Sequence, residues 1–174
     1  MKITRIAAIG LIAATVSVAG FAGCGGSDSS SASSAADTTA AAPEMTEAEF
    51  VAAATKVCTD VKAFVTDAEA SIDSASLESL QAFAASAVDK SKAAMTELRA
   101  ITPPAAMGDA YQAYLDAQAA VVDSEVAQLA AVQVSTSIDD LVAKTSTAST
   151  ADDALNTTAD TAAVAAGLPE CGGE

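Results

Sequence analysis

The chain has 174 residues, a formal net charge of −15 and no histidine. With 23 acidic residues against 8 basic ones, it is expected to repel nucleic acids and anionic lipid head groups. Without histidine it lacks the commonest general base, the commonest metal ligand and the Glu-x-x-His pairs of di-iron bundles. We therefore expect no enzyme activity, no metal site and no bound cofactor.

The first 23 residues have the pattern of an export signal. Lys2 and Arg5 give a positive start, and residues 6–19 that follow contain no charge. A helix of that length rises about 21 Å, which is short of the ~30 Å hydrocarbon core of a bilayer. The pattern favours a cleaved signal peptide over the alternative, an uncleaved membrane span.

The three residues Ala22-Gly23-Cys24 resemble the lipobox of bacterial lipoproteins, with Phe21 where that motif more often has Leu. In that family the cysteine takes a diacylglyceryl group and an N-acyl chain such as palmitate, and the signal is cut just before it. The resemblance implies that Cys24 is the lipidated first residue of the mature protein. Two or more acyl chains make a stable anchor, so the implied location is the extracytoplasmic face of the cell membrane.

Cleavage would also change the charge of the protein and leave a long linker. Removing Lys2 and Arg5 leaves 6 basic and 23 acidic residues, a net charge of −17. Residues 25–43 contain no large apolar side chain and cannot form a core. As a flexible coil they span about 24 Å. The predicted segments are therefore a signal peptide (1–23), a lipidated cysteine with its linker (24–43) and a helical domain (44–174).

Capping signals and apolar periodicity predict the first two helices of this domain. Thr46 and Glu49 fit a capping box. Apolar residues then recur at spacings of three and four from Phe50 for about seven turns, as on one face of a helix. A turn at residues 71–76 follows, and the second helix begins near Ser76. It is expected to end before Pro103, since a proline disfavours the helical conformation of the preceding residue.

Two more helices are predicted in the second half of the chain. Pro103 and Pro104 are expected in the first turn of the third helix, which continues to about Val134. Ser137 is the expected N-cap of the fourth helix, and Gly167 its left-handed C-cap. Residues 145–150 ("TSTAST") are poor helix formers, so the fourth helix is either continuous or divided, with a new start at Ser149.

Four amphipathic helices with short connections predict an all-α fold, an antiparallel up-down four-helix bundle. In that topology the end of the fourth helix lies beside the start of the first, which brings Cys171 within reach of Cys58. An exported protein meets an oxidising compartment, where such a pair usually forms a disulfide. The alternative is two free buried thiols.

The only tyrosines, Tyr111 and Tyr114, are the candidate ligand-binding residues. Three residues apart on one helix, they can line an aromatic groove. The alternative is that they fill the core with their hydroxyls at its rim. The acidic pairs at 139–140 and 152–153 lack the alternating ligands and glycine of a calcium loop, and are expected to be solvated helix starts.

The whole-chain pattern also resembles the small helical lipoproteins of actinobacteria, a group that implies a cell-envelope location and supplies no activity. The pattern consists of the lipobox, an acidic linker, alanine-rich helices, a cysteine in the first helix and a terminal "GLPEC". We therefore expect a membrane-anchored lipoprotein whose bundle is a non-catalytic interaction or structural module. The alternative is a small-molecule or lipid-binding envelope lipoprotein. The expected partners are the membrane, through the anchor, and an envelope protein or a small apolar ligand, but no nucleic acid.

Overall fold

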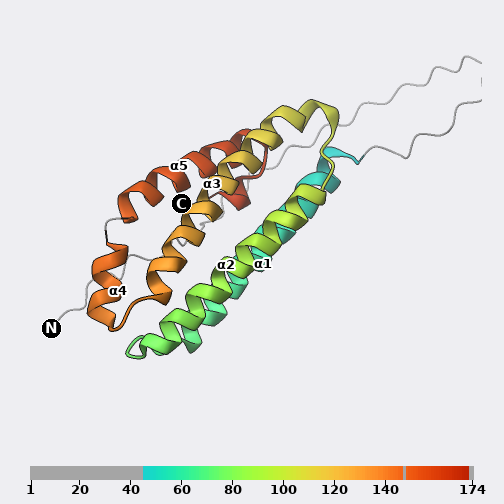
Figure 1. Cartoon of the computed structure of the whole chain (residues 1–174). Coiled ribbons are helices and arrows are strands. Elements are labelled where there is room, and N and C mark those ends of the chain that lie inside the picture. The colour runs from blue at the N-terminus through green and yellow to red at the C-terminus, as the bar shows by residue number, and fades with distance from the viewer. Residues whose placement is uncertain (1–44, 147, 173–174) are drawn as a thin grey trace, which may run out of the picture.

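The computed structural model describes residues 45–146 and 148–172, and this part of the chain is all-helical, with no strand (Figure 1). The predicted signal peptide, the lipobox with Cys24 and the linker lie outside the described residues. The α-helices are α1 (Glu47–Ser71), α2 (Leu77–Ala100), α3 (Gly108–Gln133), α4 (Ile138–Thr145) and α5 (Ser149–Ala165). Two short 3₁₀ helices, η1 (Ala105–Met107) and η2 (Pro169–Cys171), complete the fold. The all-α prediction is confirmed.

The helices run in alternating directions, with α2 between α1 and α3 (Figure 1). Helix α3 packs against both α2 and α5, and α4 lies at the far end of α3. Each of α1, α2 and α3 therefore crosses the length of the molecule once. Helices α4 and α5 together make the fourth crossing. None of the described helices is long and apolar enough to cross a membrane.

The predicted helix starts agree with the capping contacts. The backbone N–H of Glu49 donates to Thr46 Oγ1 at 3.3 Å, and the N–H of Thr46 donates to Glu49 Oε2 at 2.9 Å, which together make the capping box of α1. Ser76 and Ser137 each accept one backbone N–H in the same way, at the starts of α2 and α4. These side chains satisfy N–H groups that have no partner inside the helix.

The start of the third helix differs from the prediction, and the fourth helix follows one of its two predicted alternatives. The third helix does not begin at the prolines, because Pro104 is extended (ψ 146°) and η1 must turn the chain before α3 starts. The fourth helix is divided, as one of the two readings of residues 145–150 predicted. Near the break, the hydroxyl of Thr145 donates to the carbonyl of Leu141 at 3.0 Å. Such hydroxyls offer the backbone alternative hydrogen bonds, which makes this segment a poor helix interior.

The end of α5 has the predicted left-handed cap. Gly167 has φ 73°, and its N–H donates to the carbonyl of Val164 at 3.1 Å. The N–H of Leu168 donates to the carbonyl of Ala163 at 2.9 Å, which completes a Schellman motif. Leu168 is fully buried, so the motif also directs the C-terminal tail into the core.

The core lies toward the end of the molecule where α1 begins and α5 ends. Every long helix and the C-terminal tail contribute to it, so the tail is part of the packing and not an appendage. Its largest fully buried side chains are Tyr111, Tyr114, Phe50 and Leu168.

Candidate functional site

The two tyrosines proposed from the sequence as groove residues lie inside the core. Tyr111 and Tyr114 are 2% and 1% exposed. The Tyr111 ring meets Phe50 edge to face at 4.8 Å, and its hydroxyl donates to the carbonyl of Leu98 at 2.6 Å. Burial raises the pKa of Tyr111 to about 12 and raises that of Tyr114 further, so both hydroxyls stay protonated at neutral pH. They act as internal packing residues here and do not form the wall of an open groove.

Cys58 and Cys171 are joined by a disulfide, as predicted. Their sulfur atoms are 2.02 Å apart, and their Cα atoms 5.2 Å apart. The hydroxyl of Tyr114 lies 3.7 Å from Cys58 Sγ, and Lys62 Nζ donates to the carbonyl of Glu170 at 2.6 Å. The tail therefore folds back along α1 and is fixed there by a covalent bond and a hydrogen bond.

A polar layer crosses the interior between α2, α3 and α5. Glu125 on α3 is largely buried, it is hydrogen-bonded to Ser91 on α2, and its Oε2 has no hydrogen-bond partner within the described residues. Burial, with the nearby carboxylate of Asp152 as a smaller cause, raises the pKa of Glu125. Asp152 itself accepts hydrogen bonds from Ser124 and Gln128.

The predicted acidic pairs take two different roles. In the first, Asp140 accepts the backbone N–H of Thr136 at 2.9 Å and pairs with Lys144 at 2.8 Å. In the second, Asp152 turns into the polar layer, which the sequence did not predict. Among the described residues no group of three or more His, Cys, Asp or Glu could hold a metal ion.

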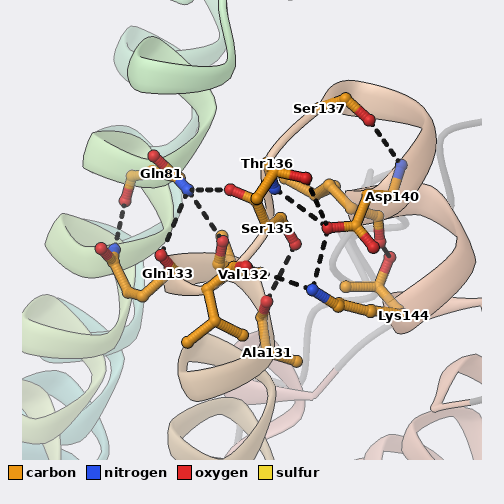
Figure 2. Close-up of polar contacts among 12 residues, drawn as sticks. Gln81, Ala131, Val132, Gln133, Ser135, Thr136, Ser137, Asp140 and Lys144 are labelled. Atoms are coloured by element: carbon orange, nitrogen blue, oxygen red, sulfur yellow. Dashed lines mark hydrogen bonds and ion pairs between the residues drawn. The ribbon is translucent and has the colours of Figure 1, made fainter.

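A polar corner joins the end of α3 to α4 and to α2 (Figure 2). The side-chain amide of Gln81, on α2, donates to the carbonyls of Val132 at 3.0 Å and Ser135 at 3.1 Å. Gln133 donates in return to the carbonyl of Gln81 at 3.1 Å. The last carbonyls of a helix lack partners inside it. These contacts therefore make the corner a structural cap for the end of α3.

A shallow open groove lies between α2 and α3 and is here called the α2–α3 groove. Its volume is about 270 Å³, and it is lined by Lys92, Met95, Thr96 and Arg99 of α2 and by Ala119, Val122, Asp123 and Val126 of α3. Met95 and Val122 supply apolar surface, and the exposed Lys92 and Arg99 stand on the α2 side. Sequence analysis missed this site, although the two cations share one helix face two turns apart.

The two groove cations differ from the basic residues that are held in ion pairs on their own helices. Lys56 and Lys144 form ion pairs with Asp60 and Asp140 on their own helices. The side chains of Lys92 and Arg99, like that of Lys90, make no hydrogen bond or ion pair in the part of the chain that the structure describes. Two unpaired cations beside an apolar surface, in a strongly acidic protein, are suited to bind carboxylates of another molecule.

Comparison with protein-family models, with curated proteins and with solved structures finds no match to this chain. The function must therefore be argued from the site and the sequence alone.

Proposed function

We propose that this protein is a membrane-anchored lipoprotein of the cell envelope whose helical body is a non-catalytic module for binding a protein partner. In this proposal Cys24 carries a diacylglyceryl group and an N-acyl chain after cleavage of residues 1–23, and residues 24–43 are a flexible tether. The body is an antiparallel four-helix bundle in which α4 and α5 together form the fourth helix. The likeness of residues 1–24 to lipoprotein signals supports the anchor.

The observation that carries the binding role is the α2–α3 groove with its unpaired cations. Its volume of about 270 Å³ lies just below the ~300–1,000 Å³ of typical small-molecule sites, which also enclose most of their ligand. The open groove leaves Lys92 and Arg99 in solvent. These features favour the surface of another protein over an enclosed small molecule or lipid, the second function that the sequence suggested.

The anchor is tested by expressing wild type and Cys24→Ser in a bacterium that lipidates its exported proteins. The wild-type protein is expected to begin at Cys24, to carry the mass of the acyl groups and to sediment with the membrane. Cys24→Ser is expected to lack the lipid and to keep residues 1–23. Cys58→Ser is the matched control, since it removes a different cysteine and should remain lipidated. A wild-type mass without lipid would contradict the anchor.

The binding role is tested by crosslinking on intact cells. Reversal of both groove charges in K92E/R99E is expected to abolish the crosslinked product of the wild type. The control K56E/K144E changes the net charge equally but leaves the groove intact, so it is expected to crosslink as wild type does. Equal crosslinking by K92E/R99E would exclude the α2–α3 groove as the binding surface.

A further inference from the structure

We infer that the partner of the α2–α3 groove is a second copy of this chain, bound through a twofold axis that runs along the groove. The inference deepens the proposed binding role and rests on it, but it does not depend on the lipid. It follows from the arrangement of opposite charges on the two helices that form the groove.

The α2 side of the groove is positive, and the α3 side is negative. On α2, Lys92 and Arg99 are seven residues apart, so they lie on one face about 10.5 Å from each other. On α3, the exposed Asp116 and Asp123 have the same spacing. Asp123 lines the groove with Lys92, and yet no ion pair joins them within the described residues.

We call Lys92 and Arg99 the positive column, and Asp116 and Asp123 the negative column. The two columns also match in direction. Helices α2 and α3 run antiparallel (Figure 1), so the numbering rises along one and falls along the other. Arg99 therefore lies two turns nearer than Lys92 to the end of the molecule where α1 begins. Asp116 lies two turns nearer than Asp123 to the same end. The positive column of Lys92 and Arg99 therefore extends beside the negative column, in which Asp123 lines the groove and Asp116 lies two turns beyond it.

This arrangement is complementary to itself. A twofold axis parallel to the groove does not change the position of a residue along the helix direction. It places α2 of one copy over α3 of the other. Lys92 of each copy then faces Asp123 of the other, and Arg99 faces Asp116. The same contact covers Val126, which is 37% exposed. A positive column alone would have suited any acidic partner, whereas adjacent columns of both signs at equal spacing favour a second copy.

The size of the surface agrees with a dimer. Helices of 24 and 26 residues are about 36–39 Å long, and two neighbouring helices are roughly 20 Å across. The face they form approaches the ~800 Å² that each partner buries in a typical stable interface. The high net negative charge of both copies opposes association, but salt screens distant charges beyond about 8 Å, so the close pairs dominate.

The test uses two charge-reversal variants that are complementary to each other. K92E/R99E makes all four charges of the two columns negative, and D116K/D123K makes all four positive. Each variant alone places like charges opposite each other in the dimer. Mixed together, they restore every ion pair with reversed sign. The readout is native mass spectrometry of the full-length proteins released from detergent micelles, with circular dichroism to show that each variant is folded.

We expect wild type to form dimers, and each variant alone to dimerise at least ~10-fold more weakly, given several surface ion pairs replaced by repulsions. The mixture of the two variants is expected to form heterodimers at the wild-type level. The control mixture is K56E/K144E with D67K/E69K, which carries the same charge changes away from the groove and should form no excess of heterodimers.

Two results would overturn the inference. One is a wild-type protein that remains monomeric at concentrations on the order of 100 µM. The other is a control mixture that forms heterodimers as readily as the groove mixture, which would assign the association to overall charge. Neither result bears on the lipidation of Cys24, which is tested separately by the mass comparison with Cys24→Ser. A third result is a crosslink to a different protein that is lost in K92E/R99E. The groove would then still be a binding surface, but its partner would be that protein and not a second copy.

Discussion

At the scale of single residues, the polar groups that the fold buries mostly have internal partners. Tyr111 is almost fully buried, but its hydroxyl is satisfied by the carbonyl of Leu98. A buried hydroxyl without a partner would cost about 1–3 kcal/mol. Glu125 is the exception, because one of its oxygens has no partner within the described residues.

Glu125 makes the stability of the protein depend on pH. Burial raises its pKa above the ordinary value of 4.5, so the folded state binds this proton more tightly than the unfolded chain does. Stability is therefore lost as the pH rises from the unfolded pKa through the raised folded pKa. Glu125→Gln keeps the shape and removes the charge. We expect it to increase the free energy of unfolding at pH 7 by about 1 kcal/mol, with no gain near pH 4.

Urea unfolding followed by circular dichroism between pH 4 and pH 8 measures this difference. Glu97→Gln is the matched control, since Glu97 is exposed on α2 and its replacement removes the same charge from the surface instead of the interior. A destabilised Glu125→Gln at pH 7 would show that the charged form of Glu125 is stabilised in the fold, contrary to the effect of burial.

At the scale of helices, the ends decide where each element begins and how it is joined to the next. Thr46, Ser76 and Ser137 begin their helices through side chains that act over three residues, which is why their positions could be predicted. The end of α3 is different. Its carbonyls are capped by Gln81, which lies about 50 residues earlier in the chain and on another helix (Figure 2).

Replacement of Gln81 by alanine tests this long-range cap. The change removes the donor shared by the carbonyls of Val132 and Ser135, and we expect it to destabilise the protein by about 1–2 kcal/mol. Amide hydrogen exchange in α4 should accelerate, because the corner that holds α4 is loosened. Gln112→Ala is the control, since Gln112 bonds only Asp116 on its own exposed helix face. Equal stability of the two variants would mean that the corner contributes nothing measurable.

At the scale of the whole molecule, the disulfide closes the fold by joining its first helix to its C-terminal tail. The bonded cysteines are 113 residues apart. Loops of that length lose much conformational entropy when the chain is crosslinked, which in the chain-entropy model gives an upper estimate of about 4.8 kcal/mol. Cys171 belongs to the same hydrophobic core as Phe50, Tyr114 and Leu168, and Cys58 packs against that core.

Removal of the disulfide in C58S/C171S is expected to lower the free energy of unfolding by about 2–4 kcal/mol, because the unfolded chain regains its freedom. Urea unfolding with and without a reducing agent measures it. The reductant should destabilise wild type by a similar amount and leave C58S/C171S unchanged. A double variant as stable as the oxidised wild type would contradict a stabilising role for the link.

The sequence by itself determined the features that depend on neighbouring residues. These are the all-α class, the starts of α1, α2 and α4, the Gly167 cap and the weak segment at residues 145–150, since each is set by side chains a few positions apart. The sequence also favoured the pairing of Cys58 with Cys171 over two free thiols, because alternating helix directions bring the two chain segments together, and the structure shows the bond.

Only the tertiary structure decided which faces of the helices meet. A spacing of three residues suits both a groove and a core for Tyr111 and Tyr114, and packing against Phe50 and Leu98 placed them in the core. The burial of Glu125 and the matching of the Lys92 column to the Asp123 column depend on the register between separate helices. That register is set by contacts between residues far apart in the chain, which no local periodicity encodes.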